Sequence, residues 1–316
     1  MIEVSVVVPV RDQERFIGRC LDSILEQKTS FPIEILVGDD CSTDNTRKIL
    51  AEYAAKNDNI KLFLRETQLG ATQNVVDLCT KMQGKFFAYL EGDDYWCDPD
   101  KLQIQYNFLT THPDFVGCFH DVLLVDEHDR PIRKKLNWIT SKKTLTFDDY
   151  DGYHLPGHSS CWVRKNLYAI DPNPFSFIAE AHDSIGDRTS ALCFLSFGNF
   201  GKVDGAMSCY RYMRESGKNN LTARLYPRHV NCAMTESDIL DKMERFCSDV
   251  LLRPKSFEKR RREIASYSLL YFLRHPSKEN RNVLRQAYSR VRNKPLFWIT
   301  MPFVSVKLVF NTIQKA

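Results

Sequence analysis

The stretch KFFAYLEGDDYW, residues 85–96, decides the fold that we expect. Its run from Phe86 to Leu90 is apolar, as in a buried strand, and is followed by Glu91, Asp93 and Asp94. Neighbouring carboxylates repel one another, and burial strengthens that repulsion. The stretch therefore predicts a strand whose end binds something of positive charge.

Strand and helix patterns alternate on both sides of this stretch. Apolar runs predict strands at 3–8, 33–40, 60–65 and 85–90. Helical spacing predicts a helix at 14–27, a second one that ends at about Lys56, a third at 71–82 and a fourth that starts at Pro99. Ser42 or Thr43 is expected to cap the second of these helices. The alternation predicts an α/β fold with a mostly parallel central sheet and helices on both faces.

The later sequence is less regular. Strands are expected at 115–125, 159–165 and 201–212, and helices at 180–197, 235–252 and 256–275. At the N-terminus, MIEVSVVVPV is typical of a buried strand and not of a signal peptide. No two of the ten cysteines lie closer than 15 residues, so the close pairs of many zinc sites are missing and we expect free thiols.

Carboxylates gather in the loops after the predicted strands. The loops PVRDQE, DDCSTDNT and EGDDYW would share the carboxyl edge of the sheet, where ligands bind in such folds. A nucleotide diphosphate with Mg²⁺ or Mn²⁺ explains them, because these cations take oxygen ligands. Asp93 and Asp94, beside Gly92, are the candidate metal ligands. The alternative is that Asp and Gly simply gather in turns.

Three longer motifs resemble a known family. VSVVVPVRDQERFIGRCLDSILEQ, EILVGDDCSTDNT and YLEGDDYWCDPDKL are similar to the N-terminal half of family 2 glycosyltransferases of the GT-A fold, and the resemblance covers about residues 2–215. It implies a donor pocket and places the metal on the acidic loop, at Asp93 and Asp94 rather than at Glu91, where the family pattern has Asp. The residues expected to line the pocket are Pro9, Val10, Asp12, Glu14, Asp40, Arg65, Gly92 and Asp93.

The resemblance also implies a general base at the start of a later helix, ahead of a glycine turn and a Tyr-Arg pair. Asp187, followed by Gly198 and Tyr210–Arg211, fits that order, although Arg188 stands where an aromatic residue is usual. Asp183, four residues earlier on the same predicted helix, is the alternative.

Further side chains are candidates for smaller roles around the ligands. His158 is a candidate contact to the donor or the acceptor, and Arg211 and Arg214 are candidate phosphate partners or structural ion pairs. Trp96 is expected either to stack on a sugar or to pack in the core.

The C-terminal part is strongly basic. Residues 253–316 hold 15 Lys or Arg and three acids, whereas residues 1–252 hold 29 basic and 37 acidic side chains. The tail KPLFWITMPFVSVKLVFNTIQKA is too short to span a bilayer but suits an amphipathic helix lying in an anionic membrane surface. A helix packed on the protein or on a second copy is the alternative.

The expected organisation has three parts. Residues 1–230 form a GT-A catalytic domain with nucleotide-binding (1–120) and acceptor-binding (121–230) halves, residues 231–294 a basic helical extension, and residues 295–316 the tail. The resemblance implies an inverting glycosyltransferase of surface polysaccharide synthesis, on the inner face of the cell membrane. It would use a nucleotide-diphosphate sugar and a glycan or lipid-linked acceptor.

Other functions remain open at this point. The alternatives are a metal-dependent nucleotidyltransferase and a non-catalytic sugar-nucleotide-binding subunit. A dehydrogenase is disfavoured because no GxGxxG follows the first strand. We expect no nucleic-acid partner.

Overall fold

The structure is a computed structural model that describes residues 1–171, 173–213 and 231–302. Arg214 and the tail beyond residue 302, which have expected roles, lie outside the described residues.

The chain divides into two compact units. Met1–Tyr150 and His154–Arg224 make the first unit, and Asp151–Tyr153 and Leu225–Ala316 make the second. The expected catalytic domain ends at residue 230, six residues after the first unit ends. It also includes residues 151–153, which belong to the second unit.

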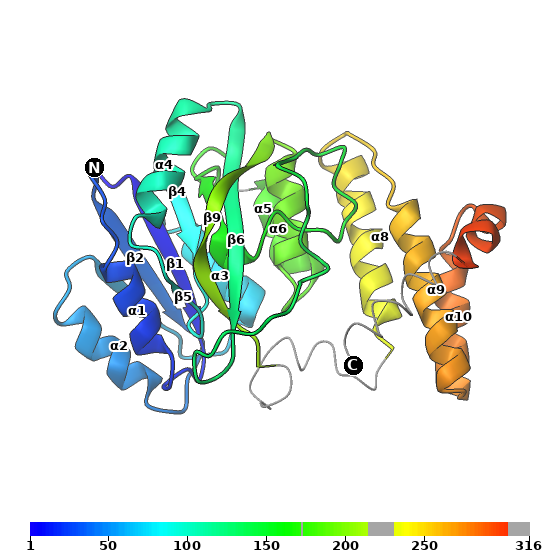
Figure 1. Ribbon diagram of the computed structural model, residues 1–316, viewed down its shortest axis with the longest axis horizontal. Coiled ribbons are helices and arrows are strands. Elements are labelled where there is room, and N and C mark those ends of the chain that lie inside the picture. The colour runs from blue at the N-terminus through cyan, green and yellow to red at the C-terminus, as the bar shows by residue number, and fades with distance from the viewer. Residues whose placement is uncertain (172, 214–230, 303–316) are drawn as a thin grey trace. The chain divides into compact units, whose positions relative to one another are not determined.

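One sheet forms the centre of the first unit (Figure 1). Its strands lie in the order β3-β2-β1-β4-β8-β6-β9-β5, and β7 pairs with β9. Their bounds are β1 Val4–Val10, β2 Ile33–Asp39, β3 Ile60–Leu64, β4 Phe86–Tyr89, β5 Tyr95–Trp96, β6 Phe115–Val125, β7 Thr144–Leu145, β8 Val163–Lys165 and β9 Asn199–Arg211. The first four strands in this order are parallel, while β8 pairs antiparallel with both β4 and β6.

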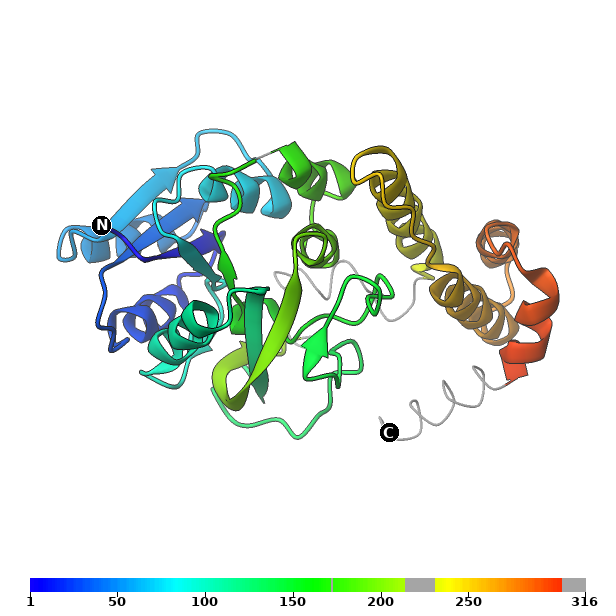
Figure 2. The ribbon, with the colours of Figure 1, turned by 90° about the horizontal axis from the view of Figure 1, so that it is seen from above.

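Helices cover both faces of this sheet. Their bounds are α1 Ile17–Leu25, α2 Thr46–Ala54, α3 Ala71–Cys79, α4 Lys101–Thr111, α5 Asn173–Ala181 and α6 Asp187–Leu195. Helices α1 and α4 lie on one face, with α2 beside α1, and α3, α5 and α6 lie on the other (Figure 2). The predicted α/β fold is therefore confirmed.

Two-sided cover explains the continuous apolar sequence of the central strands. Val4, Val6 and Val8 of β1 are fully buried and pack in one core with Ile35 and Val37 of β2. Burial of such a side chain contributes about 1.5–3 kcal/mol. The register pairs Val10 with Asp39, so β1 and β2 end at the same edge, and the chain leaves β4 for the acidic loop close by. The packing thus brings the polar loops together.

Several local predictions are wrong. Helix α2 begins at Thr46. The backbone N–H of Thr46 donates to Asp44 Oδ1, so neither Ser42 nor Thr43 is the cap. Residues 159–161 form a short 3₁₀ helix, η1 (Ser159–Cys161), instead of starting a strand.

The helix expected at 180–197 is in fact two helices. The backbone N–H groups of Ser184 and Ile185 donate to His182 Nδ1, which accompanies the break between α5 and α6. Asp183 therefore lies in the bend between α5 and α6, and does not share a helix face with Asp187.

The second unit is helical. It contains α8 (Ala233–Asp249), α9 (Glu258–Arg274), α10 (Lys278–Ser289) and a helical segment at 294–302. Acids of α8 neutralise part of the basic charge, since Arg261 pairs with Asp241 and Arg292 pairs with Glu244. The charge excess expected from the sequence alone is thus smaller at the surface.

All ten cysteines are free, as predicted. Within the described ranges, we find no helix with the length and apolar character needed to cross a membrane.

Candidate functional site

The loops after β1 and β2 hold each other at the carboxyl edge of the sheet. Asp12, at a φ of 51°, donates its N–H to Ser42 Oγ at 2.9 Å, and its Oδ1 accepts the N–H of Thr43 at 2.7 Å. Glu14 Oε2 accepts the N–H of Asn45 at 2.9 Å. The contacts of Asp12 and Glu14 therefore join two loops, and a direct contact to a ligand stays a prediction.

Asp40 ties a third segment to this edge. Its two carboxylate oxygens accept the backbone N–H groups of Leu69 (2.6 Å) and Gly70 (3.0 Å). These bonds hold the turn before α3. The place of Asp40 in the wall of the donor pocket stays a prediction, but the carboxylate already anchors the segment before α3.

Asp39 precedes Asp40 and was not expected in the site. Its Oδ2 accepts from Arg47 Nε at 2.6 Å, while its Oδ1 is buried and has no hydrogen-bond partner among the described residues. Arg65 pairs with Asp77 of α3 and follows β3. Asp39 thus offers a buried acceptor that the sequence pattern did not single out.

The acidic loop packs closely on the end of β1. A Cβ atom on Gly92 would come within 3.2 Å of Val10 Cγ2, which is tighter than ordinary contacts. The turn is closed by the N–H of Asp94, which donates to the carbonyl of Glu91 at 3.0 Å. Gly92 and Val10 therefore shape the loop, and Pro9 lies one residue before Val10 in β1.

Arg211 holds the acidic loop from the end of β9. Its backbone N–H donates to Asp94 Oδ1 and its Nε donates to the carbonyl of Asp93, both at 2.9 Å. Its Nη2 lies 2.7 Å from Oδ1 of Asp129. With the side chain 2% exposed, Arg211 fulfils the structural role rather than that of a phosphate partner.

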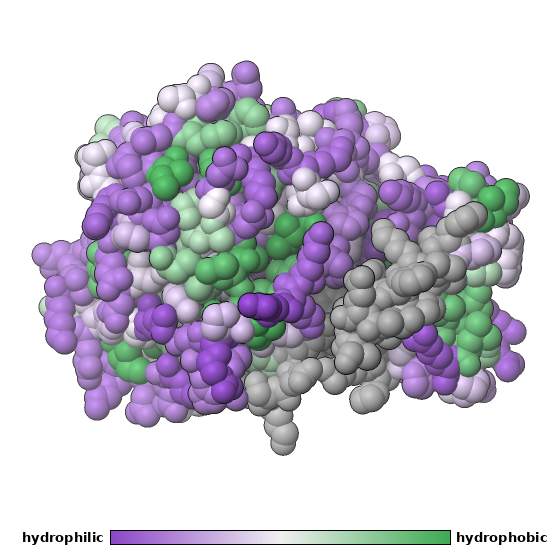
Figure 3. Space-filling view, in the orientation of Figure 1, coloured by the Kyte–Doolittle hydropathy of each residue, from purple (hydrophilic) through white to green (hydrophobic). Residues whose placement is uncertain are grey.

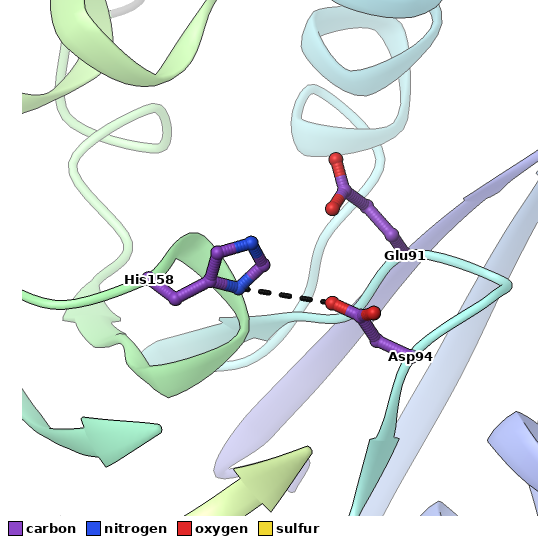
Figure 4. Close-up of side chains that lie close together, drawn as sticks. All are labelled: Glu91, Asp94 and His158. Atoms are coloured by element: carbon purple, nitrogen blue, oxygen red, sulfur yellow. Dashed lines mark ion pairs between the residues drawn. The ribbon is translucent and has the colours of Figure 1, made fainter. Parts of the chain in front are cut away.

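Three side chains converge beyond β4. Ligand atoms of Glu91, Asp94 and His158 all lie within 4.8 Å of one another, and Figure 4 shows the imidazole and both carboxylates around one space. Asp94 Oδ2 lies 3.7 Å from His158 Nδ1 and, among the described residues, has no hydrogen-bond partner. Asp93 is not part of this cluster, which differs from the expected ligand pair.

The cluster places like charges close together in a buried region. Burial, then the charges of Asp93 and Glu91, raises the pKa of Asp94 well above its usual range. Burial, then Asp93, also raises the pKa of Glu91. These shifts reflect the cost of placing like charges together in a poorly solvated place.

A divalent cation fits this donor set. Burial lowers the pKa of His158 to about 3, so its imidazole is neutral, as metal ligation requires. Two carboxylates supply oxygen ligands, and the buried Asp94 Oδ2 lacks a partner that a cation would provide. Mg²⁺ and Mn²⁺ suit carboxylate oxygen, and an imidazole favours Mn²⁺ over Mg²⁺.

Asp187 borders the same region from another element. It is the first residue of α6, and its Oδ1 accepts the N–H of Arg188 at 2.7 Å. Its negative charge contributes to raising the pKa of Glu91 and the pKa of Tyr89. Asp187 is thus a further carboxylate near the cluster, brought there from 96 residues beyond Glu91 along the chain.

Trp96 belongs to the core. It is 3% exposed, and its Nε1 donates to the carbonyl of Ser160 at 3.1 Å.

His158 is held by stacking on Tyr210, with ring centroids 4.1 Å apart. Two members of the cluster differ from the expected metal ligands, since the family pattern favours Asp93 over Glu91 and the sequence offers His158 only as a contact to the donor or the acceptor. His158 is the last residue of LPGH, and this stretch matches no sequence pattern of metal ligands.

Comparisons with known proteins agree with this architecture. Residues 5–169 match the family model described as "Glycosyl transferase family 2". An uncharacterized protein of Mycobacterium tuberculosis is 40% identical over 124 residues, which make up 39% of this chain and 36% of that protein. Poly(ribitol-phosphate) beta-N-acetylglucosaminyltransferase TarS of Staphylococcus aureus is 33% identical over 129 residues, 40% of this chain and 21% of TarS. The chain thus matches 36% of the length of the first relative and 21% of the length of the second.

A solved structure shares the fold over nearly the whole chain. The crystal structure of S. aureus TarS 1-349 in complex with UDP-GlcNAc aligns with a TM-score of 0.64 and 17% identity, covering 97% of this chain and 89% of that chain. At this identity the likeness concerns the fold.

Proposed function

Because this chain belongs to glycosyl transferase family 2, we propose that it transfers a sugar from a nucleotide-diphosphate donor to a hydroxyl group of a glycan or lipid-linked acceptor, with inversion. The observation that carries the proposal is the cluster of Glu91, Asp94 and His158 beyond the parallel strands. Ligands of such sheets bind at that edge. The relative TarS, named for N-acetylglucosaminyl transfer and crystallised with UDP-GlcNAc, supports a nucleotide-sugar donor.

The cluster would hold the cation. Glu91, Asp94 and His158 are the proposed ligands, with Asp93 as the fourth candidate in the same loop. Mg²⁺ or Mn²⁺ supplies positive charge that stabilises a departing diphosphate. The raised pKa values of Glu91 and Asp94 support this assignment, because a cation would relieve the repulsion that causes them.

Asp187 is the proposed general base. It would accept the proton of the acceptor hydroxyl as that oxygen bonds to the anomeric carbon, while the bond to the diphosphate oxygen breaks. Its support is its position at the start of α6, near Glu91 but on a different element from the acidic loop. Asp183 is less favoured as the general base, because it lies in the bend before α6.

The donor would lie against the loops that follow β1 and β2. Pro9, Val10, Asp12, Glu14, Asp40, Arg65, Gly92 and Asp93 are the proposed wall of this pocket. The hydrogen bonds of Asp12 and Asp40 to neighbouring loops favour a rigid wall, which lowers the entropic cost of binding.

The acceptor is proposed to be a surface glycan precursor, with the enzyme on the inner face of the cell membrane. Leu273, Trp298 and Ile299 of the second unit are exposed. Figure 3 shows hydrophobic surface (green) over α10 and the segment 294–302. Such side chains beside basic residues suit an anionic membrane surface.

Thermal unfolding with a panel of UDP-, GDP-, ADP- and dTDP-sugars, in Mn²⁺ or in EDTA, tests the function. We expect one nucleotide class to raise the unfolding temperature in Mn²⁺ only, since a ligand that binds the folded state stabilises it. The donor found is then incubated with acceptor extracts, and release of the nucleoside diphosphate is measured. Pyrophosphate release from a nucleoside triphosphate would instead support a nucleotidyltransferase. Donor binding without any turnover would support a non-catalytic subunit.

A further inference from the structure

The helical second unit contains a cavity of about 650 Å³, lined only by residues between Asp241 and Arg292. Five basic side chains line it: Arg245, Lys255, Arg261, Arg290 and Arg292. The acids in its wall are Asp241, Glu244 and Asp249, so the lining has an excess of two positive charges.

Two guanidinium groups share one carboxylate in this wall. Arg261 Nη2 lies 2.6 Å from Asp241 Oδ1, and Arg290 Nε lies 3.3 Å from Asp241 Oδ2. The shared carboxylate holds the two arginines, which come from α9 and from the end of α10, side by side. Glu244 extends the arrangement, since it pairs with both Arg261 and Arg292.

Both arginines keep a donor without an acceptor. Nη1 of Arg261 and Nη1 of Arg290 are buried, and neither has a hydrogen-bond partner among the described residues. Arg261 is 96% buried, because its side chain is only 4% exposed. A buried donor that lacks an acceptor destabilises the folded state, and more so when it is charged. Both Nη1 atoms lie in the wall behind the cavity surface, and Arg290 Nη2 pairs with Asp238 Oδ1 at 2.7 Å.

We propose that this cavity binds a phosphate group carried by a larger molecule. A phosphate monoester has a charge of roughly −1.5 to −2 and three strong acceptor oxygens, which suit a lining with an excess of positive charge. Guanidinium forks bind such groups well. The cavity volume lies in the range of small-molecule sites, ~300–1,000 Å³, and exceeds the need of a bare phosphate.

This site is separate from the proposed donor site. All its lining residues belong to the second unit, whereas Glu91, Asp94 and His158 belong to the first. Its occupant therefore needs no metal at the acidic loop, and the two proposals are tested independently.

The test uses the full chain in EDTA at low salt, with sn-glycerol 3-phosphate, inorganic phosphate and glycerol as probes in calorimetry. We expect saturable binding of glycerol phosphate, weaker binding of inorganic phosphate and none of glycerol. Arg290→Gln should weaken glycerol phosphate binding by about 10-fold to 100-fold, the equivalent of one charged hydrogen bond. Arg285→Gln, an equal change of charge at an exposed position of α10 outside the cavity, should bind as the wild type does.

Further variants keep the result interpretable. Arg245→Gln alters an exposed residue that lines the cavity, so folding is preserved, and it should weaken binding in the same direction. Asp94→Asn should leave this binding unchanged. Absence of saturable binding, or an equal loss in Arg290→Gln and Arg285→Gln, would overturn the proposal.

Vesicles of phosphatidylcholine with and without phosphatidylglycerol separate the two sources of phosphate. If the natural occupant is a lipid headgroup, Arg290→Gln lowers co-sedimentation with the anionic vesicles and Arg285→Gln lowers it less. If it is a soluble phosphate ester, Arg290→Gln and Arg285→Gln co-sediment alike, while only Arg290→Gln loses glycerol phosphate binding.

Discussion

The backbone N–H of Arg211, the last residue of β9, donates a hydrogen bond of 2.9 Å to Oδ1 of Asp94, which lies 117 residues earlier. The guanidinium of Arg211 also donates to the carbonyl of Asp93 and packs over the ring of Phe16 at 4.4 Å. One residue thus fixes the acidic loop against the sheet. Asp94 keeps its second oxygen, Oδ2, for another partner.

Arg211→Met is expected to destabilise the protein and to weaken donor binding. The change removes the buried donor of the backbone carbonyls of Asp93 and Asp126, and a buried acceptor left without a partner costs about 1–3 kcal/mol, whereas Asp129 keeps its pair with Arg19. Denaturant unfolding and calorimetry with the donor measure both effects. Arg19→Met is the matched control, because Arg19 pairs with the same Asp129 but is 51% exposed, and should cost at most about 1 kcal/mol. Equal losses would show that Arg211 has no special role.

Glu91→Gln and Asp94→Asn are expected to separate apo stability from metal binding. Each removes a charge from a cluster whose pKa values are raised by burial and mutual repulsion, so unfolding in EDTA should be unchanged or occur at a higher temperature. The stabilisation caused by Mn²⁺ should disappear. Differential scanning fluorimetry with a Mn²⁺ titration gives both values.

Asp93→Asn decides between the two ligand sets. If the cluster with His158 is the metal site, Asp93→Asn keeps most of the Mn²⁺ effect and His158→Ala loses it. The opposite pattern would favour the pair Asp93 and Asp94 that the sequence suggests.

Asp187→Asn should lower kcat of sugar transfer by about 10²–10⁴-fold, the usual contribution of a positioned base. Donor affinity should change little, because the lost interaction acts mainly in the transition state. Steady-state kinetics with the cognate donor and acceptor measure the change. Asp183→Asn is the control and should be milder, since Asp183 lies outside α6. Near-normal transfer by Asp187→Asn would exclude it as the base.

Deletion of residues 303–316 should reduce binding to anionic vesicles. It removes Lys307 and Lys315, each worth about 1 kcal/mol near such a surface, which corresponds to roughly 30-fold. Cutting at Asn293 is less informative, because Phe297 is buried and packs on Tyr288 at 5.1 Å. Co-sedimentation at low and high salt is the measurement. Unchanged binding after the deletion would assign membrane contact elsewhere or to no part of the chain.

Acid should destabilise the protein through His120. Burial, then the charge of Lys101, lowers the pKa of His120 from 6.5 to about 3, so between these values the unfolded chain binds more protons than the folded one. Stability therefore rises with pH across this window and is lost as pH falls, by on the order of 4 kcal/mol for this one group.

His120→Asn is expected to flatten the dependence of unfolding free energy on pH between about 6.5 and 3. His112→Asn, at an exposed position of the chain, serves as the control. Denaturant unfolding at a series of pH values measures the slope. An unaltered slope in His120→Asn would mean that other groups cause the acid lability.

The sequence predicts well where local pattern and packing agree. The strands β1, β2, β3 and β4 follow from apolar runs, because strands covered on both faces need apolar side chains throughout. It predicts less well where a single side chain redirects the backbone. His182 is one such case, since its ring accepts the N–H groups of Ser184 and Ile185 at the break that places Asp183 outside α6.

By itself, the sequence determined the α/β alternation, the edge of the sheet that carries the polar loops and the family, because these depend on the spacing of residues along one strand or loop. Only the tertiary structure decided which acids meet. Glu91 and Asp94 join His158, which lies 64 residues after Asp94, whereas the backbone carbonyl of Asp93 accepts a hydrogen bond from Arg211. Contacts between distant residues depend on strand order and on packing, which determine the distance and the desolvation of each charge, and no local pattern encodes either quantity.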